Sequence, residues 1–337
     1  MTDGNGLDGV VFVRGSYDKP GEVVPRRFLE VLSGSNAPFD TNGSGRLDLA
    51  QAITNPNNPL TARVIVNRVW HHIFGRGIVA TIDNFGKLGE RPTHPQLLDY
   101  LASQFIADGW STKNLIRLMV TSRTYQMSSE RSKPAHRLDP DNLLLQSMRV
   151  RRLDAEALRD GILAVSGNLD RRLYGESVPV HLTKFMNGRG KPAKSGPLDG
   201  DGRRSIYIAI RRNFLPSIAL AFDMPIPFST FGRRNITNVP AQSLTLMNDP
   251  FVIGQAAFWA AQVLELKTRS PAEKIDWMYQ RAFGRRPHDW EVESAMILLH
   301  SQAKGHGLSE SVALNDTKPW SDLAHALFNL KEFIYIF

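Results

Sequence analysis

The chain contains no cysteine among its 337 residues. Disulfides, cysteine-ligated zinc, thiol nucleophiles and covalently attached haem are therefore excluded within it. No apolar run approaches the ~18 residues that a membrane-spanning helix needs. Residues 1–4 do not begin a signal peptide, because no basic start followed by an apolar segment is present. We therefore expect either a cytoplasmic protein or the downstream part of a longer exported chain.

Several catalytic motifs are also missing. There is no Gly-x-Ser-x-Gly elbow for a serine nucleophile and no His-Glu-x-x-His pair for a zinc ion. A glycine-rich phosphate loop would have to precede a helix, whereas Gly75 and Gly77 lie close together and follow one. The sequence therefore identifies no established reaction.

Arginine dominates the charge of the chain. It has 29 arginines and 12 lysines against 33 acidic residues, which gives a net charge of +8. Planar arginine side chains bind carboxylate, sulfate and phosphate groups well, so an anionic polysaccharide is one partner that the composition allows. The arginines are scattered, with no basic run interleaved with aromatics, so nucleic acid is not expected as a partner. The plainer alternative is that most arginines pair with acids.

The composition, 42% hydrophobic and 22% charged, is ordinary for a soluble globular protein of one large or two modest domains. Apolar residues recur at helical spacing through most of the chain. This pattern predicts helices over residues 46–53, 62–74, 93–108, 111–120, 139–167 (with a break near Arg151), 251–266, 271–283, 289–303 and 320–330. The clearest strand is 205–211, in which Ile206, Ile208 and Ile210 alternate. We predict a mainly α fold with a minor β element.

The domain organisation follows from the breaks in this pattern. Residues 1–43 are expected to be a lead-in or linker, the tail of an upstream module, because prolines and a Ser/Asn/Gly-rich loop interrupt them. Residues 44–337 are expected to form a helical domain. Two polar connections, near 128–140 and 187–204, suggest that this domain has two lobes.

The loop at residues 40–51 partly resembles a calcium-binding loop. Asp, Asn and Ser stand at its first, third and fifth positions and glycine at its sixth, but Gln51 replaces the glutamate expected at the twelfth. The candidate metal ligands are Asp40, Asn42, Ser44 and Asp48. A polar loop in which Ser44 caps the following helix is the simpler interpretation, and we favour it.

The densest group of polar residues within apolar sequence lies between residues 58 and 100. Histidines there can bind a metal or shuttle a proton, and an aspartate can orient one of them. The catalytic candidates are His72, His94 and Asp99, with Asp83 nearby. The binding candidates are Asn67, Arg68, Arg233, Arg234 and Asn248. No known metal-ligand spacing is satisfied. A metal or acid–base site, a non-catalytic anion site and purely structural networks all remain open.

Three segments together resemble a known family. They are residues 58–99, with paired histidines and Pro-Thr-His-Pro; residues 151–160, Arg-Arg-Leu-Asp-Ala-Glu-Ala-Leu-Arg-Asp; and residues 233–251, with Pro-Ala-Gln-Ser-Leu and Asn-Asp-Pro-Phe. The family they resemble is domain of unknown function 1553, and the resemblance runs from about residue 44 to the end. The opposite charges at helical spacing in the second segment are typical of a solvated helix face.

The resemblance implies the C-terminal module of large exported proteins of planctomycetes and related bacteria, located in the periplasm or at the cell surface. It also implies upstream partner domains, among them a c-type cytochrome domain that would carry haem c outside this chain. No Cys-x-x-Cys-His motif occurs here, so no cofactor is expected within the chain. We predict a binding or scaffolding module that contacts an anionic polysaccharide. The alternative is a catalytic domain, hydrolytic or redox-coupled, around His72 and His94.

Overall fold

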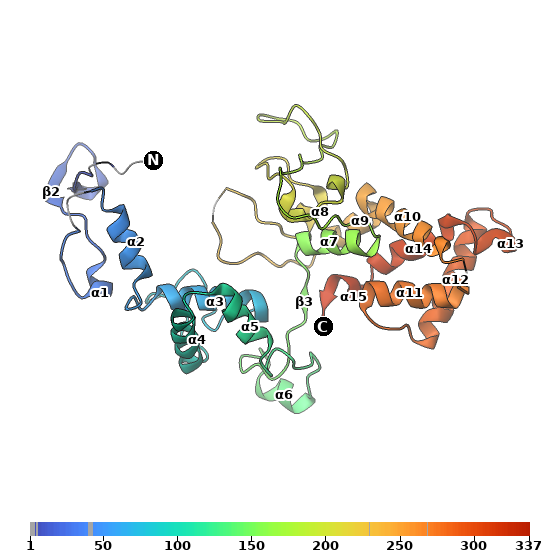
Figure 1. Cartoon of the computed structure of the whole chain (residues 1–337), viewed down its shortest axis with the longest axis horizontal. Coiled ribbons are helices and arrows are strands. Elements are labelled where there is room, and N and C mark those ends of the chain that lie inside the picture. Colours follow the sequence, from blue (N-terminus) through green and yellow to red (C-terminus); the bar gives the residue numbers. More distant parts are fainter. Residues whose placement is uncertain (1–3, 5, 40–42, 229, 268) are drawn as a thin grey trace. The chain divides into compact units, whose positions relative to one another are not determined.

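The structure of the protein is a computed structural model that describes residues 4, 6–39, 43–228, 230–267 and 269–337 (Figure 1). The chain divides into two compact units, Met1–Arg149 and Val150–Phe337. Helices predominate in both, and the strands among the described residues form two small sheets, β1–β2 and β3–β4. The mainly α fold predicted from the sequence is confirmed. No helix in the described part of the chain is both long and apolar enough to cross a membrane.

The first unit is an antiparallel hairpin followed by helices. Its elements are β1 (Gly9–Phe12), η1 (Val13–Gly15), β2 (Pro20–Val24), α1 (Glu30–Ser33), α2 (Arg46–Thr54), α3 (Thr61–Phe74), α4 (Pro95–Ala107), α5 (Thr112–Val120) and α6 (Lys133–Leu138). Helix α3 packs against α4 and α5 (Figure 1). The three helices carry most of the buried side chains in the core of this unit. The core side chains include Val66, Trp70, Phe74, Leu98, Leu101, Phe105, Leu115 and Met119.

The second unit is a helical bundle with a long irregular insertion after its first helix. Its elements are β3 (Arg151–Arg152), α7 (Ala155–Val165), η2 (Gly200–Gly202), η3 (Ser205–Tyr207), α8 (Ser217–Ala221), α9 (Pro240–Asn248), α10 (Pro250–Glu265), α11 (Pro271–Phe283), α12 (Asp289–Gly305), α13 (Glu310–Ala313), α14 (Thr317–Phe328), α15 (Lys331–Ile334) and β4 (Tyr335–Ile336). Helix α10 packs along α14, which also contacts α12. The rings of Trp259 and Phe328 stack there with centroids 5.2 Å apart, and both side chains are fully buried. Burial of a side chain the size of Phe328 contributes about 1.5–3 kcal/mol.

Local sequence signals set several helix ends. Helix α11 has the predicted bounds, because Ser270 and Glu273 form a capping box at its start and Gly284, with φ of 70°, ends it. The Ser111 side chain caps α5 by accepting a hydrogen bond from Asn114 N.

The helix expected over 139–167 is wrong in its first half, and α7 occupies only the later part. The Asp139 carboxylate accepts hydrogen bonds from the N–H groups of Leu143 and Leu144, at 2.8 Å each, and so offers the backbone a local alternative to helix. Asn142 adopts a φ of 51°, which a right-handed helix does not allow. The chain therefore forms a loop before β3.

The strand expected over 205–211 is also wrong. This segment begins with the short helix η3, and Ile208 then makes one isolated parallel bridge with Val178. The N–H of Ser205 donates to the Asp160 carboxylate at 2.7 Å, so it is not available to a β ladder. The segment with alternating isoleucines therefore makes a single bridge and does not extend into a sheet.

Candidate functional site

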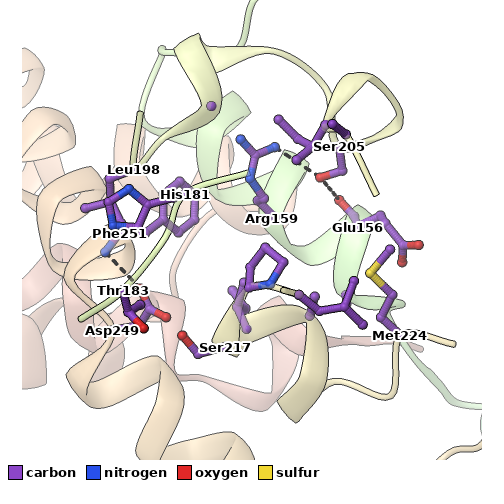
Figure 2. A pocket seen from close by; sticks show the side chains of 18 of the residues that line it. Glu156, Arg159, His181, Thr183, Leu198, Ser205, Ser217, Met224, Asp249 and Phe251 are labelled. Atoms are coloured by element: carbon purple, nitrogen blue, oxygen red, sulfur yellow. Dashed lines mark hydrogen bonds between the residues drawn. The ribbon is translucent and has the colours of Figure 1, made fainter. Parts of the chain in front are cut away.

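A cavity of about 140 Å³ opens in the second unit. Its walls come from the first turns of α7, α8 and α10 and from the insertion that joins α7 to α8 (Figure 2). A cavity of this order, ~150 Å³, accommodates a benzene-sized molecule. Apolar side chains such as Leu198, Met224 and Phe251 supply much of the lining, and polar groups occur at a few places. This composition is usual for a small-ligand pocket.

Three helices begin at the cavity. Ala155, Ser217 and Pro250 are the first residues of α7, α8 and α10, and all three line it. The first N–H groups of a helix have no acceptor within the helix, and the helix dipole makes this end partly positive. The Asp249 carboxylate caps α10 by accepting a hydrogen bond from Phe251 N at 2.9 Å, whereas no side chain caps α8. The cavity therefore offers hydrogen-bond donors beside its apolar surface.

Arg159, on α7, positions the wall that η2 and η3 form. Its Nη1 donates to the Arg203 carbonyl oxygen at 3.0 Å and to Ser205 Oγ at 3.1 Å, and its Nη2 donates to the Asp199 carbonyl oxygen. Burial lowers the pKa of Arg159, and the attraction of Asp160 offsets part of this shift. The guanidinium therefore fixes the insertion against α7 through both of its Nη atoms.

The charged segment that begins α7 is not a solvated helix face, contrary to the prediction. Arg159 is only 9% exposed. Asp160 Oδ1 accepts hydrogen bonds from both the N–H and the hydroxyl of Ser205, at 2.7 Å each. Arg152 donates to Asp223 at 2.7 Å. These charges find partners in other parts of the second unit: Arg159 and Asp160 in the insertion, and Arg152 in the chain after α8.

Glu156 connects the cavity to the segment 233–238. Arg234 donates from both Nη atoms to the two oxygens of Glu156, at 2.5 and 2.8 Å, in a bidentate pair. Burial raises the pKa of Glu156, but the hydrogen bonds from Arg234 and the backbone lower it, and the net pKa lies below its ordinary value. Arg234, a binding candidate from the sequence, therefore lies beside the cavity with its charge neutralised.

Four polar side chains of the lining keep hydrogen-bonding capacity. His181 Nδ1 lies 3.0 Å from the Gly196 carbonyl oxygen; since a carbonyl only accepts, Nδ1 carries the hydrogen and Nε2 of the neutral ring is an acceptor. The hydroxyls of Thr183 and Ser217 bond to no residue in the described parts of the chain. Asp249 uses only one oxygen for the cap of α10. Figure 2 shows Thr183, Ser217 and Asp249 at the same end of the cavity.

Arg159, His181 and Asp249 are residues of the site that the sequence did not single out. Arg159 lies in a segment of the family resemblance whose spacing of opposite charges is typical of a solvated helix surface. Asp249 precedes Pro250, and Asp followed by Pro is a helix-start signal that places it at the end of a loop. His181 lies in a segment without periodicity, so no sequence signal indicates its position.

The exposed charged candidates between residues 58 and 100 lie in the first unit and form separate pairs. Asp99 accepts a hydrogen bond from Arg63 Nε at 2.7 Å, and Arg68 donates to Asp83 at 3.3 Å. Both pairs are well exposed. Exposed pairs of this kind contribute ~0–1 kcal/mol to stability.

Asn67, another binding candidate, is completely buried. Its Nδ2 donates to the Val79 carbonyl oxygen at 2.9 Å, and its Oδ1 accepts from Val79 N at 2.8 Å. A Cβ at Gly77 would lie within 3.0 Å of this amide and of the Val79 carbonyl oxygen. Asn67 therefore joins α3 to the chain that follows it, and Gly77 permits the close approach.

The histidine candidates lie on the same unit. His94 Nδ1 lies 2.9 Å from Thr93 Oγ1 at the start of α4. His72 lies on the exposed side of α3, and its ring centroid is 5.4 Å from that of His71. In the second unit, Arg233 is exposed and Asn248 donates to the backbone of its own helix.

Two of the calcium-loop candidates, Asp40 and Asn42, lie outside the described residues. Ser44 Oγ accepts a hydrogen bond from Arg46 N at 3.3 Å, and Asp48 lies in the first turn of α2. Within the described parts of the chain, no three His, Asp or Glu residues come together to hold a metal ion.

The fold and the cavity define a helical protein with an apolar, partly polar-lined pocket. The family model described as PSD1: Protein of unknown function (DUF1553) matches residues 45–299, which include the whole cavity lining. The chain belongs to this family, as its sequence segments indicated. No curated protein and no solved structure matches the chain. The family description names no activity, so function has to be derived from the site.

Proposed function

We propose that the second unit is a binding module that takes one uncharged, hydroxyl-bearing ring, the chemistry of a sugar unit, into its cavity. The proposal is carried by the gathering of His181, Thr183, Ser217 and Asp249 around an apolar wall that includes Phe251. Hydroxyl groups both donate and accept hydrogen bonds. A hydroxyl of the ligand can therefore donate to the Asp249 carboxylate, and another can accept from the N–H groups at the start of α8.

The charges of the lining favour an uncharged ligand. Arg159 is held by carbonyl oxygens, and Glu156 is neutralised by Arg234. Arg159 also pairs with Asp160 at 3.4 Å, which leaves Asp249 as the charged group of the lining without an ion pair among the described residues. A carboxylate or sulfate in the cavity would lose its hydration and meet the Asp249 carboxylate, which is costly in a partly buried site. The arginine content suggested an anionic polysaccharide as ligand. We therefore treat an anionic sugar as the alternative ligand in the experiment below.

Isothermal titration calorimetry of the full chain tests the proposal. The neutral probes are glucose, N-acetylglucosamine and cellobiose, and the anionic probe is glucuronate. Asp249→Asn keeps an acceptor for the cap of α10 but removes the charge, so we expect the dissociation constant of a neutral probe to rise about tenfold, or ~1.4 kcal/mol.

Asp316→Asn is the matched control. Asp316 caps α14 with the same bond, from Lys318 N at 2.9 Å, and lies outside the cavity lining. We expect it to bind the probes as the wild type does. Absence of binding by every neutral probe, or equal affinity in the Asp249→Asn and Asp316→Asn variants, contradicts the proposal. Binding of glucuronate alone favours the anionic arm.

Because of the family resemblance, we also propose that the chain is the C-terminal module of an exported multidomain protein. Residues 1–43 would link it to an upstream module, and haem c would be carried by a separate upstream domain. The catalytic alternative around His72 and His94 gains no specific support, because the Asp99 carboxylate is paired with Arg63.

A further inference from the structure

The first unit contains a second candidate site, a small hollow beside Trp70 that is lined by Arg76, His94 and Arg149. The hollow holds about 10 Å³. That is close to the ~10–15 Å³ needed for one water molecule, so a larger ligand would bind at its mouth. None of these residues lines the cavity of the second unit.

The positive charge of Arg149 is not neutralised locally. Its Nη2 donates to the carbonyl oxygens of Asp141 and Asn142, at 2.5 and 2.9 Å. Carbonyl groups solvate a guanidinium but do not cancel its charge. Among the described residues, no carboxylate lies within ion-pair distance of Arg149, although Asp139 and Asp141 attract it from further away. Arg76 and Arg149 line the same hollow, so their charges repel each other, and burial together with the charge of Arg76 lowers the pKa of Arg149.

Both arginines also have unused donors. The Nε atoms of Arg76 and Arg149 are buried and donate to no acceptor in the described parts of the chain. Native proteins pair nearly all buried N–H groups, so both guanidinium groups carry hydrogen-bonding capacity that the described chain leaves unsatisfied. The pairing of Arg76 with Glu90 is a single long contact of 3.4 Å at the surface. His94 adds a ring whose Nε2 becomes a donor on protonation.

We propose that Arg76, His94 and Arg149 bind one oxyanion group: a sulfate, a phosphate or a carboxylate. An anion between the two arginines turns their mutual repulsion into attraction. Guanidinium groups present parallel N–H donors that match the oxygens of such groups, and these charge-assisted bonds are stronger than neutral ones. The site is independent of the sugar-binding proposal, because it lies in the other unit and shares no residue with the cavity.

Calorimetric titrations of the full chain with sodium sulfate, sodium phosphate and sodium acetate test the site. Chloride keeps the ionic strength constant, because salt screens exposed charges. Glucose 6-sulfate tests whether an esterified oxyanion is accepted as well as a free one. We expect Arg76→Gln and Arg149→Gln each to weaken binding about tenfold or more, the loss of one charge-assisted contact.

Arg123→Gln, in the same unit, is the matched control, because it removes the same charge from an exposed side chain that does not line the hollow. Arg149 also holds the loop after α6 through its bonds to backbone carbonyl oxygens, so Arg149→Gln could fail to fold. In that case the binding measured for Arg76→Gln tests the site. Binding of at least one of the anions that Arg76→Gln weakens and Arg123→Gln preserves supports the site. Absence of binding by all of them, or equal weakening in Arg76→Gln and Arg123→Gln, overturns it.

Discussion

Replacing Asn67 by alanine should destabilise the first unit strongly. The side chain is completely buried, and its amide supplies the hydrogen-bond partners of both Val79 N and the Val79 carbonyl oxygen, at 2.8 and 2.9 Å. Val79 is only 3% exposed, so neither group gains bulk water when the amide is removed. Each of the two unpaired buried groups costs ~1–3 kcal/mol, which predicts a loss of roughly 2–6 kcal/mol in the free energy of unfolding.

Hydrogen exchange of the full chain, measured by mass spectrometry, is the appropriate assay because it reports each unit separately. We expect Asn67→Ala to increase exchange in α3 and in the chain around Val79. Asn248→Ala is the control, since Asn248 is exposed and makes one hydrogen bond to its own helix, so its loss should cost less than ~1 kcal/mol. If Asn67→Ala changes exchange no more than Asn248→Ala does, the structural role assigned to Asn67 is refuted. If Asn67→Ala abolishes ligand binding without changing hydrogen exchange, Asn67 is a binding residue.

Two further predictions concern the candidate sites. Because the pKa of Glu156 lies below its ordinary value of 4.5, its pairing with Arg234 should contribute stability that is fully present above pH 4.5 and is lost as the pH falls through the lowered pKa. In urea titrations between pH 3 and 7, Glu156→Gln should cost ~1–3 kcal/mol at pH 7 and less at pH 3, and an equal cost at both ends would contradict this assignment. His72→Ala and His94→Ala should leave both melting temperature and metal content by mass spectrometry unchanged, whereas loss of a stoichiometric metal in either variant would favour the catalytic alternative.

The helices were largely predictable, because their signals are local. Apolar spacing located α3, α10 and α11, and the Ser270 capping box with Gly284 fixed both ends of α11. The failures occurred where side chains bond to the backbone of distant segments. Asp139 and Asp160 both accept N–H hydrogen bonds that a regular element would have used, and neither pairing is visible as periodicity.

The candidate site was less predictable than the fold. Arg63, Asn67 and His71 form a polar stripe along α3 in the sequence, yet Asn67 is buried, because its partner is the backbone of a loop twelve residues further on. The cavity depends on an insertion without regular structure, and its His181 is positioned by a carbonyl oxygen fifteen residues away. Only the family segments around Arg159 and Asp249 indicated that these parts of the chain matter.

The most direct test of the cavity as a ligand site is methyl NMR of the full chain with ¹³C-labelled methionines. Met186 and Met224 line the cavity, whereas Met119 belongs to the core of the first unit. Addition of glucose, N-acetylglucosamine or cellobiose should shift the methyl signals of Met186 and Met224 and leave that of Met119 in place. If none of these sugars moves either cavity methyl, or if Met119 alone responds, the cavity is not the binding site.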